Sequence, residues 1–166
     1  MSDVRPIITP EELLKHWQGH RALTRRVITA FPEKDLFEFS IGKMRPFSDL
    51  TKELLAIAVP GLKEIVTGTT SPYSEKDLRL ESQKEILQAW DQATDEIDRY
   101  WSQISTERFQ ETSNLFGQYN FPVINNILYF IDNEIHHRGQ GYVYLRALGI
   151  EPPFFWEREK ETLSES

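Results

Sequence analysis

The stretch that decides the fold runs from residue 121 to residue 153 and reads FPVINNILYFIDNEIHHRGQGYVYLRALGIEPP. A proline suited to the first turn of a helix stands near its start, and Gly149, Pro152 and Pro153 mark its end. Between these signals, apolar residues recur at spacings of three and four: Ile124, Ile127, Leu128, Ile131, Ile135, Tyr142, Leu145 and Leu148. This spacing predicts a helix of about seven turns with a broad apolar face.

The middle of this helix is polar and contains two glycines. The polar side chains are Asn133, Glu134, His136, His137, Arg138 and Gln140, with Gly139 and Gly141 beside them. A glycine in a helix interior costs about 0.5–1 kcal/mol relative to alanine. We therefore expect another helix or a ligand to approach the backbone closely at both glycines.

Length and composition predict one ordinary domain. The chain has 166 residues, and we expect a single domain over residues 1–156 followed by a charged, disordered tail at 157–166. Its 26 acidic and 19 basic residues give a net charge of -7, which argues against a nucleic-acid partner. The chain contains no cysteine, so disulfides, thiolate metal sites and cysteine nucleophiles are excluded.

The apolar segments are too short for a membrane protein. No apolar run approaches the roughly 18–20 residues of a membrane span, and the N-terminal residues lack the apolar core of a signal peptide. We therefore expect no membrane partner and a cytoplasmic location.

Three further helices precede residue 121. Thr9, Pro10 and Glu12 predict a capped start for the first helix, which we expect to end at Pro32. The second begins with Ser48 as its cap and stops at Gly68, and because of Pro60 we expect a kink or a short break near Val59. The third begins with a capping box at Ser82–Glu85.

These helices predict an all-α fold, a four-helix bundle with long connectors, one of which should cross an end of the bundle. Residues 105–120 are expected to be a loop, with room for a short strand pair. Ile131 and Trp90 should be buried in one core between the third and fourth helices.

Histidines of the first helix offer a weak metal signal. His16 and His20 are four residues apart, a spacing that allows two imidazoles to chelate one ion. His20 interrupts an apolar stripe, however, so we expect it to face the protein interior as an ordinary buried histidine.

Several motifs resemble the DinB/YfiT-like superfamily. They are His137-Arg138-Gly139-Gln140 with Tyr144-Leu145-Arg146, Leu148-Gly149 and Pro152-Pro153 beyond it, the stretch Met44–Leu50, and the stretch Trp17–Pro32. The resemblance covers roughly residues 10–156 and implies a four-helix bundle. It also implies a site in which three histidines hold a divalent metal such as nickel, zinc or iron.

Carried onto this sequence, the resemblance gives an altered ligand set. His137 matches one family histidine, whereas Asn133 and Glu53 stand where the other two are expected. A carboxylate, an amide and one imidazole should bind zinc or nickel much less tightly than three imidazoles. Asn133 and His137 share a helical face with Asn126, Phe130, Gln140 and Tyr144; we expect Phe130, Gln140, Tyr144 and His20 to line the pocket.

Three interpretations of this cluster remain open. The residues could bind a metal with mixed ligands, helped by His136 or His20. They could form a metal-free pocket in which Glu53 and His137 are a hydrogen-bonded acid–base pair. They could also be structural, with Arg138 paired to Glu134 one turn earlier.

The resemblance implies two classes of function. The first is a metal-dependent thiol S-transferase, or a hydrolase-like enzyme with a degenerate metal site, that uses a low-molecular-weight thiol or another small molecule. The alternative is a non-catalytic bundle that binds a small molecule, or a damage-inducible, dimeric stress-response protein. Members of the superfamily are frequently homodimers, so a homodimer is expected here as well.

Overall fold

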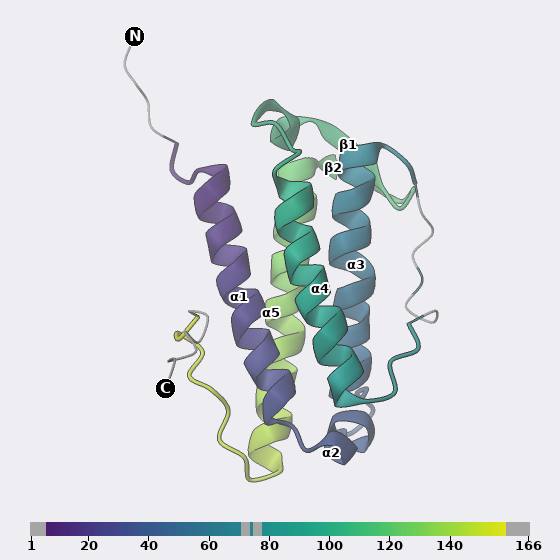
Figure 1. Cartoon of the computed structure of the whole chain (residues 1–166), viewed down its shortest axis with the longest axis vertical. Coiled ribbons are helices and arrows are strands. Elements are labelled where there is room, and N and C mark those ends of the chain that lie inside the picture. The colour runs from purple at the N-terminus through teal and green to yellow at the C-terminus, as the bar shows by residue number, and fades with distance from the viewer. Residues whose placement is uncertain (1–5, 71–73, 75–77, 159–166) are drawn as a thin grey trace.

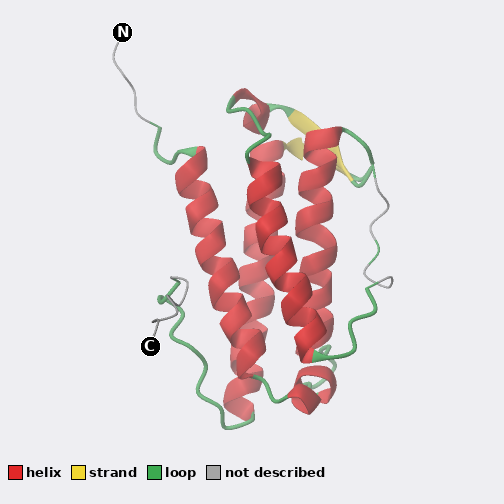
Figure 2. Cartoon of the chain, in the orientation of Figure 1, coloured by secondary structure: helices red, strands yellow, loops and turns green. Residues whose placement is uncertain are grey.

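The structure, a computed structural model, describes residues 6–70, 74 and 78–158. Four long helices form its body: α1 (Pro10–Ala30), α3 (Phe47–Thr67), α4 (Gln83–Trp101) and α5 (Val123–Ala147) (Figure 1). The connectors hold the short helix α2 (Glu33–Glu38), the 3-10 turn η1 (Glu107–Gln110) and an antiparallel hairpin of β1 (Thr112–Leu115) and β2 (Tyr119–Pro122) (Figure 2). The fold is therefore mostly helical with a small two-stranded sheet; the all-α class omits this sheet, although the sequence left room for a short strand pair at 105–120.

The four long helices form a closed ring in the order α1, α4, α3, α5. Helices α1 and α3 each pack against both α4 and α5. The starts of α3 and α4 lie at the same end of the bundle, because Phe31 at the end of α1 stacks on Phe47 and its carbonyl accepts a hydrogen bond from Gln83 at 2.7 Å. The end of α3 and the start of α4 therefore lie at opposite ends of the bundle, and residues 71–73 and 75–77 between them lie outside the described part. The segment between α1 and α3 joins helices that are not neighbours in the ring, so it crosses one end of the bundle, as predicted.

Local signals correctly predict two helix starts and fail for a third. The capping boxes at α1 and α4 are present, with Thr9 and Ser82 each exchanging hydrogen bonds with the glutamate three residues later. Helix α3 instead begins directly after Pro46 and has no side-chain cap, so the predicted cap at Ser48 is wrong. Of the kink or short break predicted near Val59, the break is wrong: α3 continues through Pro60, because its burial at five consecutive positions from Leu54 to Ala58 offsets one lost hydrogen bond.

Helix α5 turns its polar middle inward. Glu134 is 2% exposed, whereas Leu128 is 42% and Ile135 is 38% exposed, so both lie outside the apolar core to which the periodicity assigned them. Ile131 and Trp90 are both buried, as predicted, but in two separate hydrophobic clusters; the expectation of one shared core is wrong. The polar face can be buried because α1 supplies its hydrogen-bonding partners.

These partners form a buried network centred on Arg21. Its guanidinium lies 3.5 Å from the centre of the Trp90 ring and makes an ion pair with Glu134 at 3.8 Å. Burial lowers the pKa of Arg21 to about 10, although Glu134 acts to raise it. Thr24 donates to Glu134 at 2.6 Å and accepts from Arg138 at 3.1 Å. The pairing of Arg138 with Glu134 within α5, which one of the three open interpretations assumed, thus gives way to contacts of both residues with α1.

Two glycines allow α3 and α5 to pack closely. A β-carbon added at Gly141 would lie 2.6 Å from the ring of Phe47, and one added at Gly61 would lie 2.5 Å from the ring of Phe130. Each helix therefore seats a phenylalanine on a glycine of the other. The expected close approach is confirmed at Gly141, whereas at Gly139 an added β-carbon would meet no described atom of this chain within 4 Å.

The end of the described chain packs on α1. Arg158 lies 2.9 Å from a ring nitrogen of His20, and Glu157 makes an ion pair with Arg26 at 3.7 Å. These two residues of the predicted tail are therefore held in place, and residues 159–166 lie outside the described part. Of the helices in the described ranges, none has the length and apolar character needed to cross a membrane.

The Phe47–Gly141 contact leads to a stability prediction. Gly141→Ala should lower the free energy of unfolding by about 1–3 kcal/mol, because the new methyl group overlaps the Phe47 ring. In a Phe47→Leu background the same change should cost clearly less, since the smaller side chain leaves room. Urea denaturation of the four proteins measures this coupling, and purely additive losses would contradict the close contact.

Candidate functional site

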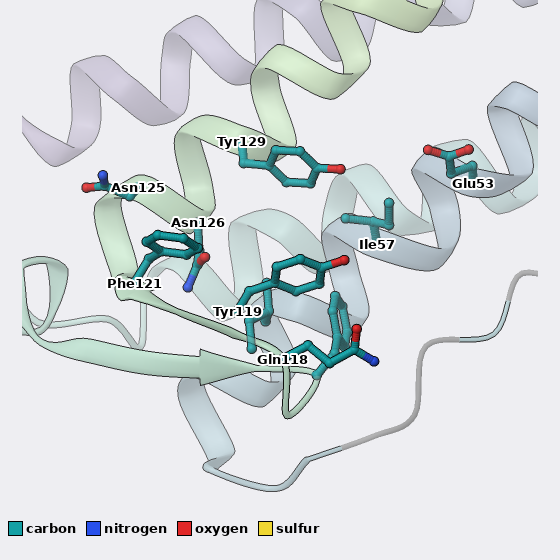
Figure 3. Close-up of a pocket in the computed structure, with 10 residues that line it drawn as sticks. Glu53, Ile57, Gln118, Tyr119, Phe121, Asn125, Asn126 and Tyr129 are labelled. Atoms are coloured by element: carbon teal, nitrogen blue, oxygen red, sulfur yellow. The ribbon is translucent and has the colours of Figure 1, made fainter.

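A pocket of about 550 Å³ lies between α3, the β1–β2 hairpin and the first turns of α5 (Figure 3). Its lining combines aromatic rings, amides and one carboxylate: Glu53, Ile57, Leu115, Phe116, Gln118, Tyr119, Phe121, Asn125, Asn126 and Tyr129. Tyr119, Phe121 and Tyr129 are each about half exposed, so their rings offer apolar surface to a bound molecule. Glu53 is the one charged residue in this lining.

The hairpin is fixed against α3 by its turn. Leu115 pairs with Tyr119 across the strands, and Phe116 and Gly117 between them have positive φ angles of 54° and 70°. A positive φ is uncommon for phenylalanine. The backbone N–H of Phe116 donates to the buried Glu64 of α3 at 2.9 Å, which holds this conformation and directs Tyr119 and Phe121 to the pocket.

Glu53 is held by two donors at the α3–α5 contact. The His137 Nε2 atom lies 3.0 Å from Glu53 Oε1, and Arg45 hydrogen bonds to Oε2. Burial alone would raise the pKa of Glu53, but the hydrogen bonds from Arg45 and His137 outweigh burial and hold the pKa below its usual value. Glu53 is therefore ionised and fixed in orientation, and its side chain remains 17% exposed.

Three nitrogen atoms on one face of α5 lack partners. Asn126 Nδ2, Asn133 Nδ2 and His137 Nδ1 are buried and have no hydrogen-bond partner among the residues that the structure describes. Buried polar groups are normally satisfied, so each such atom requires an explanation. Asn126 lines the pocket, and its unpartnered amide nitrogen is buried in the pocket wall.

Of the seven residues predicted for the site, the structure brings Glu53 and His137 into direct contact. Asn133 lies one turn before His137 and is buried. Glu53 is the one member of the predicted set that also lines the pocket.

The four residues predicted to line the pocket are engaged elsewhere. Phe130 packs on Gly61, and the Tyr144 hydroxyl donates to the Arg45 carbonyl at 2.9 Å. Gln140 lies 3.1 Å from a ring nitrogen of His136. His20 is buried between two guanidinium groups, as described next.

His20 does face the interior, as predicted. Arg138 lies 2.9 Å from its Nδ1 atom, whereas Arg158, at 2.9 Å, and His16, at 3.2 Å, both lie against its Nε2 atom. Burial, followed by the charge of Arg138, lowers the pKa of His20 to about 3. The two guanidinium charges beside the ring oppose the binding of a metal cation at His20.

The pocket residues on the hairpin were missed at the level of sequence. Tyr119 and Phe121 alternate with polar residues in a segment of eight residues or fewer, which is a strand signal. That alternation predicts a strand pair, but it does not predict the helices against which the hairpin packs. Tyr129 was missed because its helical position falls between the apolar and polar faces of α5.

The donor set fits a transition metal poorly. Within the described ranges, no cluster of three or more histidine, aspartate or glutamate side chains is placed to hold a metal ion. Glu53 and His137 are bonded to each other, the second oxygen of Glu53 carries the Arg45 guanidinium, and an amide such as Asn133 is a weak ligand for zinc or nickel. These residues form a hydrogen-bonded polar centre without a coordination shell.

Comparison with known proteins gives consistent results. A sequence profile of the DinB family matches residues 1–165. The uncharacterized protein YjoA of Bacillus subtilis strain 168 is 23% identical over 151 residues, which cover 89% of this chain and 96% of YjoA. The crystal structure of a DinB-like protein from Bacillus cereus ATCC 10987 superposes with a TM-score of 0.72 at 16% identity, covering 88% of this chain and 97% of that one. The crystal structure of YjoA gives a TM-score of 0.69 at 19% identity, with coverages of 88% and 99%.

The lowered pKa of Glu53 predicts a pH-dependent contribution to stability. Because the pKa of Glu53 is lower in the folded state than its ordinary value of 4.5, the ionised carboxylate stabilises the fold when the pH is above 4.5. This stabilisation is lost as the pH falls below 4.5 and through the lowered pKa. Glu53→Gln should therefore cost on the order of 1 kcal/mol at pH 7 and progressively less below about pH 4.5.

Urea denaturation between pH 7 and pH 3 measures this difference. Glu107→Gln, at an exposed carboxylate on η1, controls for the general loss of one negative charge. A difference between wild type and Glu53→Gln that stays constant over this range would show that the carboxylate gains nothing from Arg45 and His137.

Proposed function

The chain belongs to the DinB family, and from that premise we propose that it binds a small organic molecule in the pocket between α3, the hairpin and α5, without a metal ion. The observation that carries this proposal is the pairing of a fixed carboxylate, Glu53, with an unpartnered buried amide, Asn126, in one aromatic-walled pocket. The volume of about 550 Å³ lies within the range of about 300–1,000 Å³ that is usual for small-molecule sites.

The two polar groups define what the ligand must offer. The ionised Glu53 carboxylate accepts a hydrogen bond from a hydroxyl, amine or thiol group. The Asn126 N–H donates to a carbonyl or carboxylate oxygen. The rings of Tyr119, Phe121 and Tyr129 cover an apolar or planar body. A ligand with one donor and one acceptor on such a body fits this pocket.

Binding is better supported than catalysis by proton transfer. A general base works best when its pKa lies near the working pH, whereas Arg45 and His137 lower the pKa of Glu53. The Nδ1 atom of His137 is buried and His137 does not line the pocket. Glu53 therefore serves to orient a ligand, and His137 and Arg45 position Glu53.

The family resemblance implies a metal-dependent thiol S-transferase or hydrolase-like enzyme. Such an enzyme would need a different set of metal-ligating side chains. A low-molecular-weight thiol remains a candidate ligand, because its S–H group can donate to Glu53. Without a metal to stabilise the thiolate, however, the site would hold the thiol in its unreactive protonated form.

Ligand screening by NMR tests the proposal. Titration of the isotopically labelled protein with a panel of small molecules, low-molecular-weight thiols among them, should shift the amide signals of Asn125, Asn126 and Tyr129. For a compound that binds, Asn126→Ala should raise Kd about tenfold, equivalent to about 1.4 kcal/mol, while Asn120→Ala on the exposed part of β2 should leave it unchanged. A panel that leaves these signals unmoved, or shifts signals elsewhere, would contradict the assignment of the pocket.

Metal titration tests the second part of the proposal. Wild-type protein should bind zinc or nickel weakly. Asn133→His places an imidazole one turn before His137 and should raise the affinity at least about tenfold. Isothermal titration of both proteins in one buffer measures this gain, and tight binding by the wild type would restore the metal-dependent interpretation.

A further inference from the structure

The charge in the lining of the pocket is negative. Glu53 is held in its ionised form by hydrogen bonds from Arg45 and His137. Among the described residues that line the pocket, none is a lysine, arginine or histidine, so the lining itself offers the carboxylate no cation. The whole chain carries a net charge of -7 in addition. An anionic ligand would therefore be repelled at Glu53, whereas a cationic ligand would be attracted.

Glu53 can accept hydrogen bonds beyond those from its two protein partners. An ionised carboxylate has about four lone-pair sites, and the bonds from His137 to Oε1 and from Arg45 to Oε2 use one site on each oxygen. The Arg45 side chain is 42% exposed, so water and salt screen its charge, whereas Glu53 is only 17% exposed. Glu53 therefore keeps both lone pairs and negative charge for a donor in the pocket.

The charge of Glu53 extends to Tyr129 on the neighbouring helix. The pKa of the Tyr129 hydroxyl is raised by burial first, then by the charge of Glu53 and then by Tyr119. A negative potential opposes the loss of a proton from Tyr129, and for the same reason it favours a cation beside that ring. The two tyrosines and Glu53 thus act in the same direction on a bound charge.

The tyrosine rings offer open faces to such a cation. Tyr119 is 50% and Tyr129 53% exposed, and Figure 3 shows both hydroxyl groups on the side where Glu53 and Ile57 lie. In the described part of the chain, neither ring stacks on another ring or carries a cationic side chain over its face. Aromatic faces attract a cation within about 6 Å of the ring centre. These two faces are therefore free to hold a positive group beside the carboxylate.

We propose that the ligand of this pocket is an organic cation, with a primary or secondary ammonium group on an apolar or aromatic body. The inference rests on the binding function proposed above and names the class of its ligand. The ammonium group donates to Glu53 and lies against the rings of Tyr119 and Tyr129. The body extends toward Phe121, which lies on the opposite side of the pocket from Glu53 (Figure 3). A thiol fits less well, because S–H is a weak and uncharged donor.

Three probes with the same aromatic body and different charges test the assignment. They are 2-phenylethylammonium, 2-phenylethanol and 3-phenylpropanoate, and the amine is charged at pH 7 as a lysine side chain is. Titration of the labelled full chain, followed by the amide signals of Asn125, Asn126 and Tyr129, measures each Kd. The ammonium should bind at least about tenfold more tightly than the alcohol, and the carboxylate should bind most weakly.

Variants of the lining separate charge from packing. Glu53→Gln should weaken binding of the ammonium about tenfold and leave binding of the alcohol within about twofold, because it removes the charge at nearly constant shape. Glu107→Gln, at the exposed carboxylate on η1, should change neither. Tyr129→Phe keeps the ring and should preserve the preference for the ammonium, whereas Tyr129→Leu should reduce it several-fold. Circular dichroism confirms that each variant folds.

The outcomes distinguish this inference from the binding function on which it rests. An alcohol that binds as tightly as the ammonium would overturn the assignment of a cation and leave the pocket as a binding site. So would an equal loss for both probes in Glu53→Gln. An ammonium probe that fails to bind, while neutral or anionic compounds of the wider panel shift the pocket signals, would do the same. If no compound shifts these signals, the proposed function fails and this inference fails with it.

Discussion

The reciprocal seating of phenylalanine on glycine between α3 and α5 is the contact on which the site depends. Phe47 fits against Gly141 near one end of the pair, and Phe130 fits against Gly61 near the other. Glu53 and His137 lie between these two contacts along their helices, so the close approach of the backbones brings the carboxylate and the imidazole to 3.0 Å. A larger residue at either glycine would separate the helices, and the hydrogen bond and the wall of the pocket would change together.

Burying the polar side of α5 has a consequence for the rest of the helix. Charged groups can be buried only when they are paired and hydrogen bonded, and the Arg21–Glu134 ion pair with Thr24 and Trp90 meets that condition. Because this face is occupied, Leu128, Ile135 and Val143 remain on the outside. The orientation of α5 about its axis therefore explains both why its charged side chains are buried and why these apolar side chains are exposed.

The features that local chemistry controls could be predicted from the sequence. The capping boxes at Thr9 and Ser82 and the stop at Gly68 depend on residues within one turn. The orientation of α5 could not be predicted, because it depends on Arg21 and Thr24, more than 100 residues earlier in the chain. Glu53 and His137 were found through the family resemblance, since nothing in the spacing of two residues 84 positions apart links them. The pocket walls at Tyr119 and Phe121 escaped prediction because the turn at Phe116 places them.

The composition of the polar centre supports the proposal of a site that works without a metal. A buried carboxylate requires positive charge or hydrogen-bond donors nearby, and a metal ion is one way to supply them. Here the Arg45 guanidinium and the His137 imidazole supply two donors to the two oxygens of Glu53. A guanidinium balances charge and fixes geometry, but it offers no empty orbital to a ligand. In the binding function that we propose, the centre would therefore orient a bound molecule through Glu53 and would not activate it as a Lewis acid does.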